Sequence, residues 1–298
     1  MDDAQLLDTW EKVDALANQY GSYWRVPYFQ TAFRGHSKTW NSLLPSLARR
    51  VHGNDRFDVL SCRTVERIVR DELLARCSAS TLDELTRANW LGQAAVVRHF
   101  GAPARVLDWS QSPFVALYFA CADDMGSDGE LWFVSAHEIN AVAKVATMYD
   151  GSGDEVAPWF DSMTPEGRVA FVRPGRHSAR SAAQQCLFSV SDDPRADHRG
   201  LIEDALRKSV HHETAGWEVH GLHRLIVPAN VKEEFLKKLW HRNVHAASLF
   251  PDLEGLCRYA NDLVALYSFG MKETHRKVDE IIASSSRRNA SRRGEPNC

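Results

Sequence analysis

Residues 104–123, ARVLDWSQSPFVALYFACAD, contain the change of local pattern that decides the fold class. Their first part predicts a short strand that ends near Asp108. Their second part predicts a helix beginning at Pro113, because proline is favoured at the first helical position. Its apolar residues recur at helical spacing: Phe114, Leu117, Tyr118 and Cys121. Elsewhere strands and helices come in runs rather than in regular alternation, which favours an α+β fold.

The flanking elements follow from periodicity and capping signals. An amphipathic helix is expected at the start of the chain, with an apolar side made of Leu6, Trp10, Val13, Ala17 and Tyr20. Strands are predicted at residues 26–35, 130–134, 184–190 and 222–227, and helices at 57–76, 82–100, 228–240 and 260–282. Ser80-Thr81 and Gly101 bound the second of these helices. Residues 150–174 predict a long loop with one helical turn. We therefore expect a mixed, mostly antiparallel central sheet with flanking helices.

Composition excludes several classes of protein. The 298 residues are 44% hydrophobic and 25% charged, and the formal net charge of −3 provides no global attraction to nucleic acid or anionic membranes. No run approaches the roughly 18 apolar residues of a membrane span, and the acidic N-terminus does not resemble a secretory signal. The six cysteines are scattered without a CxxC pair, which indicates reduced thiols and no zinc site. We expect a cytoplasmic, metal-free protein that does not bind membranes.

Phe33-Arg34-Gly35-His36-Ser37 forms the first of three polar clusters, with a turn predicted at its last three residues. Arg34 is placed at the end of the strand predicted at 26–35, and Gly35 would let a ligand approach the backbone. A guanidinium in this position suits a phosphate or carboxylate. The alternative is a surface arginine that pairs with an acidic side chain on a helix.

The second cluster runs from Arg105 through Asp108, Trp109 and Ser110 to Ser112, where a loop enters a helix. Hydroxyl and backbone N–H groups at a helix N-terminus can bind an anion or a ribose. Ser112 equally suits an N-cap, and Asp108 or Ser110 can simply stabilise the turn.

The third cluster, Arg180 with Gln184-Gln185, is predicted at the start of a strand. Glutamines in this position can hydrogen-bond a ribose or an amide, or merely satisfy buried backbone groups.

Together these clusters resemble the FRG domain, which is named after its Phe-Arg-Gly. The matching segments are Phe33–Gly35, Leu43–Pro45, His99–Trp109, Ser112-Pro113, Ala116-Leu117, Gln184-Gln185 with Phe188, and Leu249–Leu256. The chain departs from the family pattern at Arg98, Ala104 and Cys186, where Gln, Thr and Gly are usual. The resemblance covers roughly residues 20–262, and we expect an FRG-type domain at residues 21–283 with the helix at 1–20 packed on it. The tail at 284–298 is basic and almost without apolar residues, so we expect it to be disordered.

A weaker resemblance is to mono-ADP-ribosyltransferases that use an arginine, a serine and a glutamate. It implies an ADP-ribosyltransferase-like core and NAD as a substrate. Arg34 would then clamp phosphate and Ser110 or Ser112 would orient the nicotinamide ribose, while Gln184 or Gln185 would occupy the position of the glutamate. The expected NAD-binding set is Arg34, Gly35, Arg105, Asp108 and Trp109. Glutamine cannot offer a negative charge to an oxocarbenium-like transition state, so Asp108 or Glu130 would have to compensate.

Three functions remain open from the sequence. The first, which we favour, is an NAD-dependent ADP-ribosyltransferase or NAD glycohydrolase, an effector of the bacterial toxin or phage-defence kind. Its acceptor would be an unidentified protein or nucleic acid. The second is a non-catalytic module that binds a nucleotide, such as NAD or ADP-ribose, or a nucleic acid. The third is a partner-binding scaffold in which the clusters only stabilise turns.

Overall fold

The fold is taken from a computed structural model of the chain. It describes residues 5–21, 31–76, 78, 90–99, 101–145, 154–173, 178–209 and 221–264, together with single positions between 267 and 284. The chain divides into two compact units, Met1–Val244 and His245–Cys298. The second unit contains helix α12 (Ala246–Leu249) and a helical stretch at residues 253–264. The sheet and the three polar clusters belong to the first unit.

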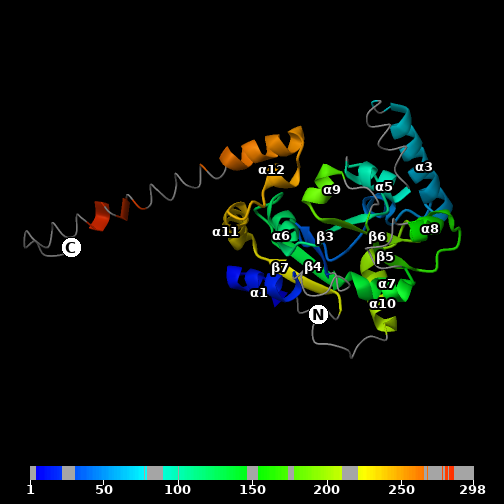
Figure 1. Cartoon of the computed structure of the whole chain (residues 1–298), viewed down its shortest axis with the longest axis horizontal. Coiled ribbons are helices and arrows are strands. Elements are labelled where there is room, and N and C mark those ends of the chain that lie inside the picture. The colour runs from blue at the N-terminus through cyan, green and yellow to red at the C-terminus, as the bar shows by residue number, and fades with distance from the viewer. Residues whose placement is uncertain are drawn as a thin grey trace, which may run out of the picture. The chain divides into compact units, whose positions relative to one another are not determined.

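Seven strands form one open sheet in the order β1-β7-β4-β2-β3-β6-β5 (Figure 1). Their bounds are Gln5–Leu6 for β1, Thr31–His36 for β2, Leu107–Ser110 for β3, Gly129–Ser135 for β4, Val169–Val172 for β5, Cys186–Ser191 for β6 and His223–Val227 for β7. The short edge strand β1 pairs in parallel with β7, and the other recorded pairings are antiparallel. The expected α+β class with a mixed, mostly antiparallel sheet is confirmed.

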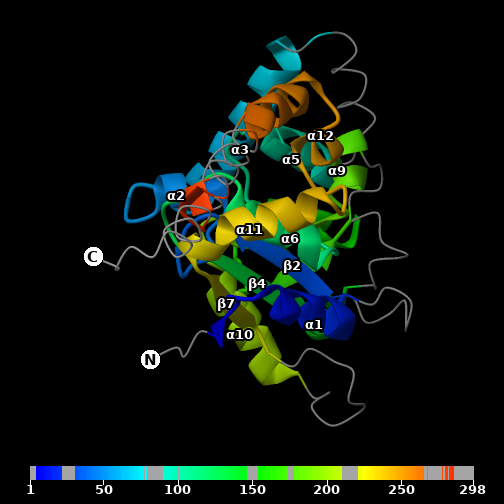
Figure 2. The same ribbon diagram turned by 90° about the vertical axis from the view of Figure 1, so that its left-hand side faces the viewer.

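Helices cover both faces of the sheet. Helix α6 (Pro113–Cys121) lies on β2 and β4, and α1 (Trp10–Tyr20) and α11 (Ala229–Trp240) pack against α6 (Figure 2). Helices α7 (Ala136–Ala143) and α10 (His198–Lys208) pack together by β5. The remaining described helices of the first unit are α2 (Ser46–Val51), α3 (Val59–Arg76), α5 (Trp90–His99), η1 (Asp154–Val156), α8 (Ala157–Asp161) and α9 (Ala179–Ala183).

The two faces of the sheet carry separate apolar clusters. Leu187 belongs to the cluster that includes Ile202 of α10, whereas its neighbour Phe188 belongs to the cluster that includes Phe160 of α8. Successive side chains of a strand point to opposite faces, so one strand contributes to both clusters. Each fully buried large apolar side chain contributes about 1.5–3 kcal/mol. The sheet is therefore held from both sides, which keeps its strand ends in place.

Two glycines allow α6 to lie directly on the sheet. A Cβ atom on Gly35 would fall 1.8 Å from the carbonyl oxygen of Ala116, and one on Gly129 would fall 2.2 Å from that of Ala120. These distances leave no room for any side chain. The absent side chain of Gly35 thus makes room for a helix, whereas the sequence had indicated an opening for a ligand.

Three expected elements need correction. Leu6 lies in β1 and not in the first helix, because a pairing with β7 that is remote in sequence outweighs the local helical spacing. The loop predicted at 150–174 contains strand β5, whose run Val169–Val172 is buried throughout against β6. The strand predicted at 184–190 begins only at Cys186. Before it, Gln184 caps α9, and Gln185 has a positive φ of 49°.

Some sequence signals hold, and others lie outside the described residues. Gly101 ends α5 with φ 82°, and the N–H groups of Gly101 and Ala102 donate to the carbonyls of Arg98 and Val97 as in a Schellman motif. Ser80-Thr81, the first residues of the strand predicted at 26–35, and the predicted tail beyond residue 284 are not among the described residues. In the described part of the chain, no helix is long and apolar enough to cross a membrane.

Candidate functional site

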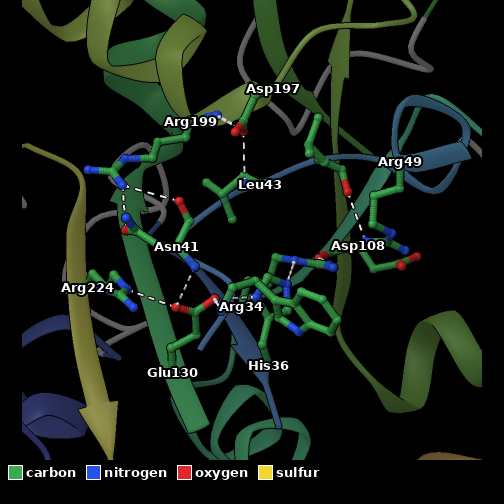
Figure 3. A network of polar contacts seen from close by, with 12 residues as sticks. Arg34, His36, Asn41, Leu43, Arg49, Asp108, Glu130, Asp197, Arg199 and Arg224 are labelled. Atoms are coloured by element: carbon green, nitrogen blue, oxygen red, sulfur yellow. Dashed lines mark hydrogen bonds and ion pairs between the residues drawn. The ribbon is translucent and has the colours of Figure 1, made fainter. Parts of the chain in front are cut away.

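Arg34 lies within β2, two residues before the strand ends, and its guanidinium is held from two sides. Its Nε donates to Nε2 of His36 at 2.8 Å, and its Nη1 donates to the carbonyl oxygen of Asp108 (Figure 3). Strands β2 and β3 are paired in register at Phe33 and Ser110. The Arg34 side chain therefore bridges the two strands next to that pair. Burial lowers its pKa to about 10, so the group stays charged at neutral pH.

Glu130 on β4 accepts hydrogen bonds from several donors close to Arg34. Its Oε1 lies 2.7 Å from Nδ1 of His36 and its Oε2 lies 2.8 Å from Nε of Arg224. The backbone N–H groups of Trp40 and Asn41 donate to the same carboxylate at 3.2 and 3.3 Å. Burial raises the pKa of Glu130, but the hydrogen bonds from His36 and Arg224 outweigh it and lower the pKa to about 2. Glu130 is thus a buried anion with both oxygens engaged.

The contacts of His36 identify its tautomer. Nε2 accepts a hydrogen bond from Arg34, so the proton of the neutral ring resides on Nδ1 and is donated to Glu130. Burial and the neighbouring Arg34 charge lower the pKa of His36 to about 4. The neutral imidazole of His36 therefore connects the Arg34 guanidinium to the buried Glu130 carboxylate, and it orients the guanidinium.

Two further arginines gather around Asp108. Arg98 of α5 forms an ion pair with it, with Nε 3.0 Å from Oδ2. Arg49 extends from α2 towards Asp108, and its Nη1 donates to the carbonyl of Leu44 at 2.9 Å (Figure 3). Burial lowers the pKa of Arg49, and so does the charge of Arg98. The pKa of Arg34 is likewise lowered by burial and then by Arg98 and Arg49.

Arg34, Arg49, Arg98 and Asp108 form what we call the arginine cluster. Of its three guanidinium groups only that of Arg98 forms a recorded ion pair with the Asp108 carboxylate, so positive charge is in excess. The Asp108 side chain is 37% exposed and the Arg98 side chain 21%, which leaves the cluster open to solvent on that side. Guanidinium groups match the oxygens of phosphates and carboxylates. The arrangement can therefore bind an anion.

The hydroxyls of Ser110 and Ser112 have structural partners. Ser110 Oγ donates to the carbonyl of Gln184 at 2.8 Å and accepts from the N–H of Ser112 at 3.0 Å. Ser112 Oγ accepts from the N–H of Val115 at 3.4 Å and caps α6. The capping role considered for Ser112 is thus present, and Ser110 connects the end of β3 to the segment before β6.

The two glutamines differ in exposure. Gln184 is buried, and its Oε1 lies 3.6 Å from the Cys186 thiol. Gln185 is exposed, and its carbonyl oxygen accepts from the N–H of Gln111 at 3.0 Å. The main chain of this pair therefore lies beside Ser110 and Gln111.

Arg105 and Trp109 have their polar groups engaged away from Arg34. Arg105 Nε lies 2.8 Å from each oxygen of Glu66, and its guanidinium lies 4.4 Å from the centre of the Phe160 ring. Trp109 is a core residue whose Nε1 donates to Ser189 Oγ at 2.8 Å. The structure brings Arg34 and Asp108 together and places these two side chains among other partners.

The sequence clusters omitted most of the residues that surround Arg34. His36 was taken only as part of a turn, and Arg49, Arg98 and Arg224 were not selected as site residues. Arg98 stood out only as a departure from the FRG pattern. Arg224 lies 94 residues from the glutamate that it contacts, so no local spacing pointed to it. Glu130 was named as a possible compensating acid, but it is buried and its carboxylate is bound by His36 and Arg224.

We expect the buried neutral histidines to make the protein less stable as the pH falls. His198 is fully buried with Nδ1 2.8 Å from Ser189 Oγ, and burial followed by the Arg34 charge lowers its pKa to about 3. Like His36, it takes up a proton near pH 6.5 only in the unfolded chain. The contribution of these histidines to the free energy of unfolding is therefore fully present above pH 6.5. It falls as the pH drops from 6.5 to about 4. The loss is at most about 3 kcal/mol for His36, at about 1.4 kcal/mol per pKa unit.

Urea unfolding between pH 7.5 and 4.5 measures this dependence. His36→Gln retains an acceptor for Arg34 and a donor for Glu130 but cannot titrate, so its stability should vary less with pH than that of the wild type. Equal slopes for the two proteins would contradict the assignment.

Comparison with known protein families finds one match. Residues 30–129 match the family model of the FRG domain, a range that includes the arginine cluster and His36 and ends one residue before Glu130. No curated protein and no solved structure matches the chain. Among the described residues, no three His, Cys, Asp or Glu side chains gather as a metal ion would require.

Proposed function

The chain carries an FRG domain at residues 30–129, and we propose that this domain binds NAD and transfers its ADP-ribose, either to an acceptor or to water. The observation that carries the proposal is the arginine cluster, where Arg34, Arg49 and Arg98 surround one partly exposed carboxylate. The pyrophosphate of NAD would bind to the three guanidinium groups.

Pre-organisation of Arg34 supports phosphate binding. Its Nε is already held by His36, and its Nη1 is held by the Asp108 carbonyl. Little side-chain freedom is left to lose when a ligand binds, and the loss would otherwise cost about 0.5–1.5 kcal/mol for a side chain of this length. Arg49 and Arg98 are less enclosed and add charge that a pyrophosphate can neutralise.

Asp108 is the acid that we assign to the chemistry. In ADP-ribosyl transfer the bond between the ribose carbon and the nicotinamide nitrogen breaks, and nicotinamide leaves with the electron pair. An acceptor oxygen or water then attacks the ribose carbon and loses its proton. Positive charge on the ribose requires a nearby anion. Glu130 is fully buried and Gln184 is uncharged, whereas the Asp108 side chain is 37% exposed.

A non-catalytic nucleotide-binding module is the second candidate. It is favoured by the serine contacts, because Ser110 Oγ already donates to Gln184 and Ser112 Oγ already caps α6. In that case the arginine cluster would hold a nucleotide and no bond would break. The two candidates differ in whether a bond of NAD breaks, and not in the acceptor, which would be a protein or a nucleic acid.

Removal of Arg49 or Arg98, the two less enclosed arginines of the cluster, should weaken NAD binding. We expect Arg49→Ala or Arg98→Ala to raise the Kd for NAD at least about tenfold, since a charge-assisted hydrogen bond contributes about 1.5–3 kcal/mol. Calorimetric titration of the folded variants with NAD measures this. Arg56→Ala, which removes an exposed arginine between α2 and α3, is the matched control and should bind like the wild type. Equal Kd values for all four proteins would reject the site.

A further variant, Asp108→Asn, distinguishes catalysis from binding alone. The catalytic proposal expects nicotinamide release by the wild type that Asp108→Asn reduces at least about tenfold, a loss of about 1.4 kcal/mol of transition-state stabilisation. Saturable NAD binding without any nicotinamide release would instead support the binding module.

A further inference from the structure

A cavity of about 220 Å³ lies between α3, α5, α8 and the loop before β3. Its lining does not include the residues of the arginine cluster. Four arginines line it, namely Arg63, Arg67, Arg70 and Arg105. Arg105 is the one that sequence analysis had assigned to NAD. The volume holds several water molecules or a small ligand.

Two of these arginines are already neutralised by neighbours. Arg105 forms a bidentate ion pair with Glu66, which lines the same cavity. Arg70 pairs with Asp71, with Nη2 3.0 Å from Oδ1. Their charges are therefore largely balanced, and they form the wall of the cavity.

The other two arginines retain uncommitted donors. Arg63 donates from Nη2 to the carbonyl of Trp159 at 3.0 Å, but its Nε and Nη1 are buried and have no hydrogen-bond partner among the described residues. Arg67 is exposed and makes no hydrogen bond or ion pair within the part of the chain that the structure describes. Buried donors of a charged group are costly when they lack an acceptor. Both atoms are closed off from solvent, so a ligand in the cavity reaches them when the Arg63 side chain turns towards it.

Acidic groups near the cavity do not supply those acceptors. Asp161 lines the cavity and is exposed, and its charge acts on Arg63 without an ion pair between them. Glu66 is already bound to Arg105. An added anion therefore meets two guanidinium groups that have no carboxylate partner among the described residues, against one unpaired carboxylate.

Apart from the polar side chains of Thr64 and Gln93, the remaining lining is apolar. Leu60 and Met163 are 52% and 53% exposed, and Phe160 and Val97 are buried. A ligand that fits both parts has a phosphate at one end and a ring or hydrocarbon at the other. A phosphate monoester carries a charge of about −1.5 to −2 at neutral pH and three strong acceptor oxygens, which matches two guanidinium groups better than a carboxylate does.

We propose that this cavity is a second ligand site, which binds a small organic phosphate of the nucleoside monophosphate class. Its phosphate contacts Arg63 and Arg67, and its ring lies towards Leu60 and Met163. The proposal does not rest on NAD binding at the arginine cluster.

Calorimetric titration with AMP tests the site, with adenosine and inorganic phosphate as partial ligands. AMP should bind at millimolar or lower concentration, and each partial ligand at least tenfold more weakly. Arg67→Ala should raise the Kd for AMP at least tenfold. Arg76→Ala removes an exposed arginine of the same helix that pairs with Glu72 at the surface, and it should leave the Kd unchanged. Arg63→Gln is a second variant, to be used if its melting temperature matches the wild type.

Three results would overturn this second site. One is the absence of AMP binding at millimolar concentration, and another is an unchanged Kd in Arg67→Ala. The third is AMP binding that Arg49→Ala abolishes, because it would place AMP at the arginine cluster. NAD binding that survives in Arg67→Ala and is lost in Arg49→Ala would show that the two sites are separate, so failure of one proposal leaves the other testable.

Discussion

Gly35→Ala is expected to destabilise the domain by about 3 kcal/mol or more, above the usual cost of overpacking. The new Cβ would lie 1.8 Å from the Ala116 carbonyl oxygen and 2.6 Å from the Ala120 nitrogen, both backbone atoms of α6. Neither can move without shifting the helix away from β2. Denaturant unfolding of the purified variant measures the loss, or low yield of folded protein reports it directly.

A second glycine provides a matched control, for which substitution by alanine should raise the stability instead of lowering it. Gly200 lies in α10, and a Cβ added there meets nothing within 4 Å. Gly200→Ala should therefore stabilise the protein by about 0.5–1 kcal/mol through the helix preference for alanine. If Gly35→Ala were as stable as the wild type, α6 could not lie on β2 as the structure has it.

Glu130→Gln is expected to cost about 3–5 kcal/mol, the usual loss when one partner of a buried ion pair is removed. Arg224 and Arg34 would lose the anion that balances them, although the side chain keeps its size. The new amide N–H groups would also face donors from His36 and from the backbone of Trp40 or Asn41. Urea unfolding at pH 7 measures the change.

The pH dependence provides a second readout for the same variant. A carboxylate with a lowered pKa contributes stability above its unfolded value, and that contribution is lost as the pH falls from about 4.5 towards 2. Glu130→Gln should lack this part of the acid transition. Glu72→Gln removes the acid from an exposed pair with Arg76 and should cost at most about 1 kcal/mol. Equal costs for the two substitutions would contradict a buried role for Glu130.

The site explains why sequence clusters were only partly informative. Arg34 and Asp108 both belonged to these clusters, and they are in contact in the structure. They lie on adjacent strands, β2 and β3, which are paired at Phe33 and Ser110. Ser112 had two readings in the sequence, and the hydrogen bond from Val115 shows that it caps the helix. Arg105 lies only three residues from Asp108, yet its side chain binds Glu66 on another helix. Proximity in sequence therefore did not indicate proximity of side chains.

The sequence by itself determined the elements whose signals are local. Ser112-Pro113 starts α6 and Gly101 ends α5, because caps and turns depend on a few consecutive residues. It also determined that an arginine would lie on an early strand. Strand β1 escaped prediction, since two residues gain strand geometry only from pairing with β7.

Only the tertiary structure decided which charges meet. His36 and Arg224 each contact Glu130 across 94 residues of chain, and Gly35 is required by a helix that begins at Pro113. Such contacts depend on strand order and register, which bring together residues without any fixed spacing in sequence. Arg34 and Asp108 were therefore visible in the sequence, whereas their partners and charge states followed from packing.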